Sequence, residues 1–204
     1  MTLGVVPGRQ ANAFMGNVPN EDIAAIVADY PEKFIGVAGI DPTNRAKALE
    51  EIERFVVNGP LKAVGMEPGV LASLMYADDR RIYPIYEYCA EHGIPVLLMS
   101  GGGNGRISAT ATRSSSTGCA ATSRNDRDHT HGGYPWVTEI LFVAFKRPNL
   151  YLCPDMYSLQ YARRERLRHG RQYLPLRAFP VRHGLSVHRL PRRRGAVQGS
   201  ALQA

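Results

Sequence analysis

The chain has 204 residues, 44% hydrophobic and 21% charged, so one globular domain with its own core is expected. The 25 Lys and Arg exceed the 18 Asp and Glu, giving a formal net charge of +7. No apolar run reaches the roughly 18 residues of a membrane span, and no secretion-signal pattern opens the chain, so we expect a cytoplasmic protein. The three cysteines are widely spaced and fit neither a disulfide framework nor a zinc ribbon: Cys89, Cys119 and Cys153.

The positive charge is concentrated in two segments. Residues 161–204 hold eleven Arg and one acid, Glu165, and residues 106–128 hold four Arg and two Asp. The rest of the chain therefore has a formal net charge of −5. Both segments lack the apolar periodicity of helices and strands, and they are rich in Arg with Ser and Thr or with Pro and Gly. The basic excess therefore belongs to these segments and not to the protein as a whole.

The remaining sequence alternates between short apolar runs and amphipathic stretches. A strand end is predicted at 2–6, followed by a helix at 21–29 with Asn20 as its cap. Further apolar runs predict strands at 34–41, 61–67, 94–100 and 149–155, and helical periodicity predicts helices at 43–58, 78–92 and 135–147. Strands that alternate with helices form a parallel sheet covered by helices, so the predicted fold class is α/β.

The spacing of the predicted strands contains one irregular interval. The strands begin at 34, 61, 94 and 149, so the last interval of 55 residues is about twice the 27 and 33 before it. One more strand–helix unit should lie inside this interval, and its strand should end near His131. The region is filled by the Ser-, Thr- and Arg-rich segment 106–128, which is either an irregular insert or a replacement of a normal element.

Four stretches resemble a known family: DYPEKFIGVAGIDP at 29–42, LKAVGMEPG at 61–69, DDRRIYPIYEYCAEHGIPVLLMSGG at 78–102 and HGGYPWVTEILFVAFKRPNLYLCPDMY at 131–157. In order and spacing they resemble the amidohydrolase-related hydrolases and decarboxylases, whose members include aminocarboxymuconate-semialdehyde decarboxylase. The resemblance implies a (β/α)₈ barrel with its site at the carboxyl ends of the strands. The family's opening His-x-His strand has no counterpart here, so we expect a partial TIM-type barrel lacking the first and eighth strands.

The resemblance also divides the chain. Residues 1–157 are expected to form the partial barrel, with 106–128 aberrant, and residues 158–204 an Arg-rich tail that is disordered or non-native. We hypothesise that the chain is truncated at its N-terminus and that 106–128 and 158–204 are frame-shifted translations. Arg, Ser, Pro, Gly and Ala are what a GC-rich gene encodes out of frame. The alternative is a genuine disordered basic tail.

Polar residues end the predicted strands, where a barrel would gather them around one opening: Asp41, Glu67, Ser100, His131 and Asp155. His131 resembles the family's histidine after the sixth strand, and the near-neutral pKa of imidazole suits a general base. We therefore predict His131 as the catalytic residue. Substrate contacts are predicted from Glu67, Ser100, Trp136 and Asp155. A structural role is the alternative for each, and Asp41 before Pro42 is interpreted as helix capping.

The resemblance implies a divalent metal, zinc above all, although some relatives work without one. His131 is a candidate ligand. His129 forms a second match to His-x-His, but zinc needs a third ligand and an ordered strand. We therefore interpret His129 as a coincidental match, and the ligand set stays unknown.

Three functions follow from these observations. The first is a hydrolase or decarboxylase of a small carboxylated or cyclic substrate. The second is a non-catalytic barrel fragment that serves as a binding module. The third is nucleic-acid binding through the Arg-rich tail, which salt-dependent titration would test and which we do not expect. We expect a small-molecule partner, no membrane association and a homo-oligomer.

Overall fold

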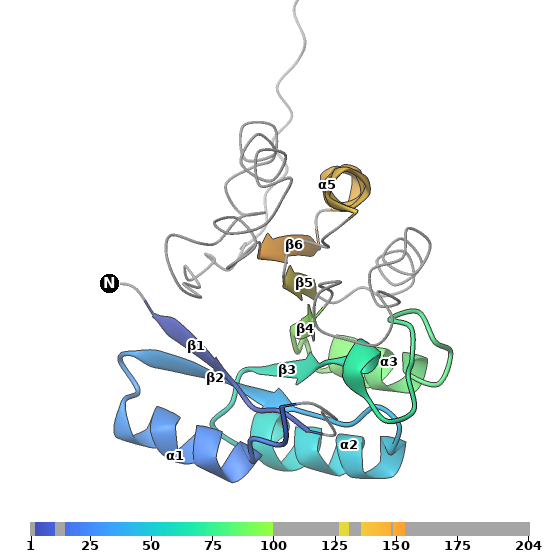
Figure 1. The fold of residues 1–204 in the computed structure, drawn as a ribbon. Coiled ribbons are helices and arrows are strands. Elements are labelled where there is room, and N and C mark those ends of the chain that lie inside the picture. Colours follow the sequence, from blue (N-terminus) through green and yellow to red (C-terminus); the bar gives the residue numbers. More distant parts are fainter. Residues whose placement is uncertain (1–2, 11–14, 100–126, 131–135, 148, 154–204) are drawn as a thin grey trace, which may run out of the picture.

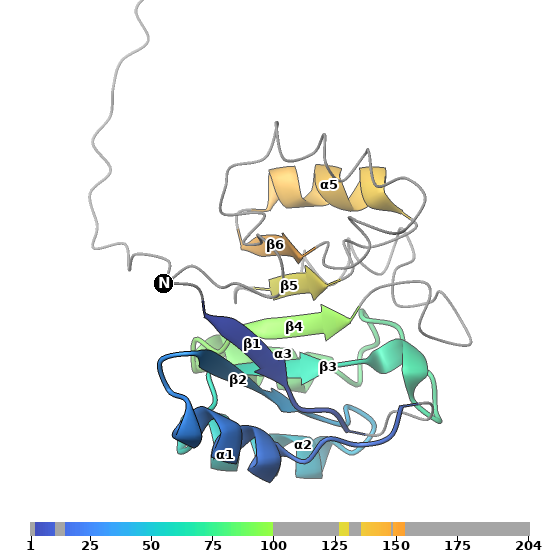
Figure 2. The same cartoon turned by 60° about the vertical axis from the view of Figure 1, so that its left-hand side comes forward.

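The computed structural model describes residues 3–10, 15–99, 127–130, 136–147 and 149–153. These residues form a parallel sheet of six strands, which lie side by side in chain order. The strands are β1 (Gly4–Pro7), β2 (Phe34–Gly39), β3 (Ala63–Met66), β4 (Val96–Met99), β5 (Arg127–Thr130) and β6 (Leu150–Cys153). Their carboxyl ends therefore share one edge, as the parallel arrows of β3 to β6 in Figure 2 show.

The helices lie on the outer side of the curved sheet (Figure 1). They are α1 (Asn20–Asp29), α2 (Arg45–Ile52), α3 (Tyr83–Glu91) and α5 (Val137–Lys146). A π-helical turn, η1 (Glu53–Val57), extends α2, and a short 3₁₀ turn, η2 (Pro68–Val70), follows β3. This arrangement is a half-barrel in which each helix covers the strands next to it.

Apolar side chains fill both faces of the sheet. On the outer face, Ile52 of α2 and Ile85 of α3 pack with Val64 and Val96 of the strands, and each is at most 1% exposed. On the inner face, a smaller cluster joins Val5, Val37, Ala63 and Leu97 from four neighbouring strands. Because side chains alternate along a strand, the inner residues form the lining of the barrel.

The structure confirms the predicted α/β class and the predicted strands, each within a few residues. The interval argument is also confirmed, because β5 lies between β4 and β6 and ends at Thr130, next to His131. The helix predicted at 78–92 begins only at Tyr83, since residues 76–82 form turns in which Asp79 N–H donates to the Tyr76 carbonyl at 3.1 Å.

One local prediction is wrong. Asn20 does not cap the helix that it begins, because the N-cap position is Pro19 and no side-chain hydrogen bond caps the helix. The Asn20 side chain is instead 1% exposed and bonds to β2 and α2. By contrast, Asn44 caps α2 through its side-chain oxygen, which accepts from Lys47 N–H at 3.3 Å.

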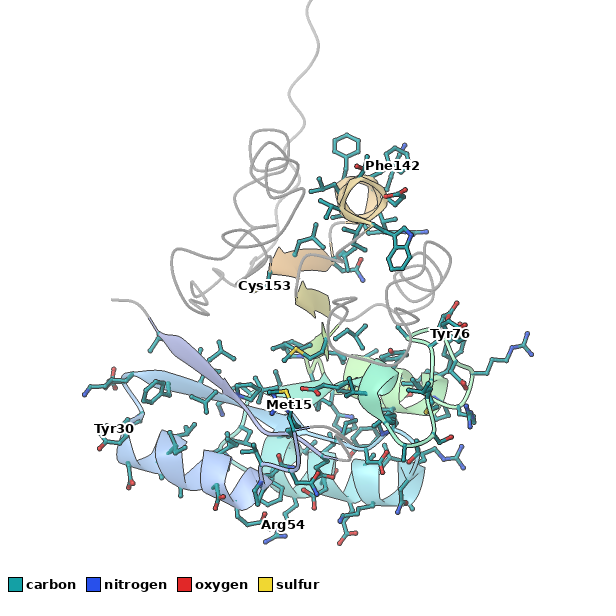
Figure 3. The ribbon with its side chains drawn as sticks, viewed as in Figure 1. Met15, Tyr30, Arg54, Tyr76, Phe142 and Cys153 are labelled. Atoms are coloured by element: carbon teal, nitrogen blue, oxygen red, sulfur yellow. The ribbon has the colours of Figure 1, made fainter. Side chains whose placement is uncertain are left out.

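The surface of the described residues includes a few large apolar side chains. Phe142 and Phe145 of α5 are 63% and 65% exposed, and Figure 3 shows Phe142 on the side of α5 that faces away from β6. No helix in the described ranges combines the length and the apolar character that crossing a bilayer requires.

Candidate functional site

A pocket lies at the shared edge formed by the carboxyl ends of the first four strands. Its lining residues are Pro7, Gly8, Arg9, Gln10, Val37, Ile40, Gly65, Met66, Glu67, Leu97 and Met99. Val37 and Leu97 belong to the inner apolar layer, so the pocket opens above the lining of the half-barrel. Active sites of (β/α)₈ barrels lie at this edge because the loops from several strands converge there.

Arg9 and Glu67 are the charged residues of this pocket. The Nε atom of Arg9 donates to Oε1 of Glu67 at 3.1 Å, and the side chains are 23% and 15% exposed, respectively. Glu67 lies just beyond β3, and Arg9 lies two residues beyond the end of β1. Within the described residues the two Nη groups of Arg9 make no hydrogen bond, so a guanidinium with its outer donors available stands over an apolar floor.

The backbone around Arg9 is held on both sides. Gly8 N–H donates to the Val37 carbonyl at 2.8 Å, and Arg9 forms an antiparallel bridge with Val18 through bonds of 2.9 and 2.8 Å. Gly8 packs directly on Gly39, since a Cβ at position 8 would lie 2.9 Å from the Gly39 nitrogen. This close approach requires glycine at both positions.

A buried polar network lies beneath the same loop. Asn20 bonds to both backbone groups of Gly39, and its Nδ2 also donates to Oε2 of Glu51 at 2.6 Å. The same Glu51 oxygen accepts from Nε2 of Gln10 at 3.1 Å. The network thus connects α1, the end of β2 and α2 to the residue that follows Arg9.

Of the residues predicted from the sequence, Glu67 lies in the pocket. Trp136 is the half-buried residue directly before α5 and is not part of the pocket lining. Asp41 accepts from the backbone N–H and the hydroxyl of Thr43 at 2.9 and 2.6 Å, so it stabilises the turn before α2 and is not the helix cap predicted for it, because Asn44 holds the N-cap position. Ser100, His131 and Asp155 lie outside the described residues.

The strands that lead to these three positions are aligned. Met99, Thr130 and Cys153, the last residues of β4, β5 and β6, are in register with one another. Figure 3 marks Cys153 at the end of β6, and its side chain is buried. Strands β4, β5 and β6 therefore end at the same level of the sheet.

Register also places position 129. His129 pairs with Leu98 of β4 and Leu152 of β6. Both leucines pack in the outer clusters beneath the helices. The backbone of residue 129 thus pairs with two residues whose side chains pack against the helices.

The residues missed by sequence reasoning are Arg9, Gln10 and Glu51. The signal available for Arg9 was its place three residues after a predicted strand, where a barrel presents loop side chains to its opening. Gln10 and Glu51 carry no comparable local signal, because their contact joins positions 41 residues apart.

The described residues do not fit a divalent metal. No group of three or more His, Cys, Asp or Glu side chains gathers within the described ranges. The Glu67 carboxylate already faces a guanidinium, whereas protein metal sites combine several oxygen, nitrogen or sulfur ligands around the cation.

Solved structures resemble this fold over most of the chain. An uncharacterised TIM-barrel protein from Bordetella bronchiseptica superposes with a TM-score of 0.80 and 34% identity, covering 90% of this chain and 64% of the other. The 5-carboxyvanillate decarboxylase of Sphingomonas paucimobilis superposes with a TM-score of 0.59 at 17% identity, covering 81% of this chain and 60% of the other. A manganese-bound dihydroxybenzoic acid decarboxylase from Polaromonas gives 0.51 at 16% identity, covering 78% and 59%. The chain is thus a partial (β/α)₈ barrel.

Sequence comparison agrees with the fold. A 2-amino-3-carboxymuconate-6-semialdehyde decarboxylase from Dictyostelium discoideum is 27% identical over 79 residues, which are 39% of this chain and 21% of that protein. The chain spans less than two thirds of the length of each of these relatives. The sequence model of the amidohydrolase family, Amidohydro_2, matches residues 4–176. The chain therefore belongs to the amidohydrolase family.

Proposed function

We propose that this protein is a hydrolase or decarboxylase of a small carboxylated or cyclic substrate that binds in the pocket at the strand ends. The observation that carries this proposal is the Arg9 guanidinium, which Glu67 holds at 3.1 Å over the apolar floor of the pocket. The decarboxylases among its relatives act on acids, which fits a pocket that offers a cation.

The geometry suits an acid with an apolar body. Glu67 accepts from Nε of Arg9, so the guanidinium plane is fixed and its two Nη groups remain as a fork for another acceptor. A carboxylate matches this fork with two parallel hydrogen bonds, which neither a hydroxyl nor an amide can do with full charge. Val37, Leu97 and Met99 would contact the apolar part of such a molecule.

We further propose the roles predicted from the sequence for the other candidate residues. His131 acts as the general base, taking a proton from water in hydrolysis or returning one to carbon after loss of CO₂. Ser100, Trp136 and Asp155 contact the substrate. His131 is also the candidate ligand through which zinc, or another divalent ion, would bind, since the described residues supply no ligand set.

Turnover assays test this function on the full chain. The purified protein is incubated with 2,6-dihydroxybenzoate or 5-carboxyvanillate, with and without added Zn²⁺ or Mn²⁺, and CO₂ release is measured. We expect release that Arg9→Ala reduces and that Arg54→Ala, an exposed arginine on α2's extension, leaves unchanged. Binding of these acids without turnover under any metal condition would favour the non-catalytic binding module instead.

Two further expectations belong to the same proposal: a cytoplasmic location and a homo-oligomeric state. Sedimentation velocity at several protein concentrations distinguishes a single species at the monomer mass from a concentration-independent oligomer. A monomer at all concentrations would contradict the second expectation.

A further inference from the structure

Asn20 is a buried polar side chain whose hydrogen bonds are fully matched. Its Oδ1 accepts from Gly39 N–H at 2.8 Å, while its Nδ2 donates to the Gly39 carbonyl at 3.0 Å and to Glu51 Oε2 at 2.6 Å. The side-chain acceptor faces a donor and the donors face acceptors, which fixes the orientation of the amide. A buried amide held in this way acts as a rigid structural connection.

The Asn20 amide bonds to backbone groups on the edge of β2 with which β1 would otherwise pair. The two strands are in register at Pro7 and Val37, and Gly8 N–H still donates to the Val37 carbonyl. The next groups on that edge are the N–H and carbonyl of Gly39, and both bond to Asn20. Arg9 consequently bonds to Val18 and not to β2, so Asn20 ends the pairing of β1 and β2 one residue before Arg9.

Glu51 holds the chain on the other side of Arg9, at Gln10. Its Oε2 accepts from Asn20 and from Nε2 of Gln10, the residue that follows Arg9. Hydrogen bonds to an ionised carboxylate are stronger than those between neutral groups. Arg9 therefore stands between Gly8, which packs against Gly39, and Gln10, which is bound to α2 through Glu51.

We propose that Asn20 and Glu51 are positioning residues that set the place of Arg9 over the pocket and thereby its affinity for an anionic group. This proposal rests on the proposed function, because it describes Asn20 and Glu51 by their effect on the binding of an anionic group at Arg9. Asn20 and Glu51 do not line the pocket. Among the described residues, Glu51 reaches the pocket through its bond to Gln10, and Asn20 reaches it through Gly39, on which Gly8 packs. Preorganised side chains bind more tightly because less conformational freedom is lost on binding.

Three variants of the full chain separate positioning from stability. Gln10→Ala removes one bond to Glu51, and Asn20→Ser shortens the side chain that joins Gly39 to Glu51. Asn44→Ala is the matched control, because this exposed asparagine stabilises α2 through its cap and has no contact with the pocket. If Asn20→Ser does not fold, Glu51→Ala replaces it, because Glu51 is half-buried and lies outside the pocket lining, whereas Gln10 itself lines the pocket.

Two readouts are used. The first is hydrogen exchange of the Arg9 Nε–H, measured by nitrogen-15 NMR and assigned by its absence in Arg9→Lys. The second is the Kd for benzoate, a monocarboxylate probe. In Gln10→Ala and Asn20→Ser we expect faster Nε–H exchange and a benzoate Kd about three- to tenfold higher. Asn44→Ala should lower the midpoint of unfolding and change neither readout.

The outcomes distinguish the two proposals. Unchanged Nε–H exchange and unchanged benzoate Kd in the folded Gln10 and Asn20 variants would overturn the positioning role. Suppose that the wild-type chain does not bind benzoate but that the Arg9 Nε–H still exchanges faster in the variants. The positioning role then stands, and the carboxylate-binding function is wrong.

Discussion

Arg9 and Glu67 lie 58 positions apart in the sequence, yet Arg9 Nε and Glu67 Oε1 are 3.1 Å apart at the edge where the strands end. One residue follows β1 and the other follows β3, so the contact crosses the end of β2. Glu67 restrains the guanidinium on one side, and the outer nitrogens of Arg9 stand over the apolar floor of the pocket. A charged pair of this kind combines a structural contact with a binding surface.

Glu67→Gln should weaken the fold modestly. The amide keeps an oxygen that accepts from Arg9 but loses its charge, so a half-buried charge-assisted bond becomes an ordinary one. We expect the free energy of unfolding, measured in urea, to fall by about 1 kcal/mol. Glu21→Gln is the control, because its pair with Arg54 is 54% and 61% exposed, and exposed pairs contribute less than about 0.5 kcal/mol. Equal losses in both variants would show that the Arg9 pair is no better than a surface contact.

Gly39→Ala should affect both stability and the pocket. A Cβ at position 39 would lie 2.6 Å from the Gly8 carbonyl oxygen, and backbone cannot move aside as a side chain can. We expect the free energy of unfolding to fall by about 3 kcal/mol and benzoate to bind more weakly, because the segment that carries Arg9 must shift. Gly93→Ala serves as the comparison: its φ is 64° but nothing lies near its Cβ, so it should lose about 1 kcal/mol and leave binding intact.

The Tyr88 hydroxyl donates to the Glu53 carboxylate, and this bond raises the pKa of Tyr88 to about 12. Because the pKa in the folded state is raised, the contribution of this bond to stability is complete below the ordinary tyrosine pKa of about 10. It is lost as the pH rises through 12. The same bond lowers the pKa of Glu53.

Ultraviolet titration of the phenolate, taken as the difference between wild type and Tyr88→Phe, measures this effect. Glu53→Gln should return the pKa of Tyr88 toward about 10, its ordinary value. A difference titration centred near the ordinary value in the wild type would contradict the contact.

The strands and helices with regular apolar patterns could be predicted from the sequence, because burial selects those patterns locally. Strand β5 could be predicted only from the interval between its neighbours, since Arg127–Thr130 has no apolar run. Asn20 was misassigned as a cap because its partners, Gly39 and Glu51, are 19 and 31 positions away. Arg9 was missed for the same reason, while Glu67 was found because its strand and the following Pro-Gly mark a strand end.

The hypothesis of a shifted reading frame in 106–128 can be tested at strand β5. Arg127 pairs through its backbone with Val96 of β4 and Leu150 of β6, and both of these residues are buried. His129 is in the same situation. We expect Arg127→Val with His129→Leu to raise the stability of the chain by about 1–3 kcal/mol.

Sequencing the gene across this segment gives the independent check. An uninterrupted frame with no alternative that encodes apolar residues at 127 and 129 would contradict the frame-shift hypothesis.

The proposed function depends most directly on whether Arg9 binds a carboxylate. Isothermal titration of the full chain with benzoate and with benzamide, in the wild type and in Arg9→Ala, measures this. We predict that the wild type binds benzoate at least about tenfold more tightly than benzamide and that Arg9→Ala removes the difference. Equal affinities for the two compounds in the wild type, or an unchanged preference in Arg9→Ala, would contradict it.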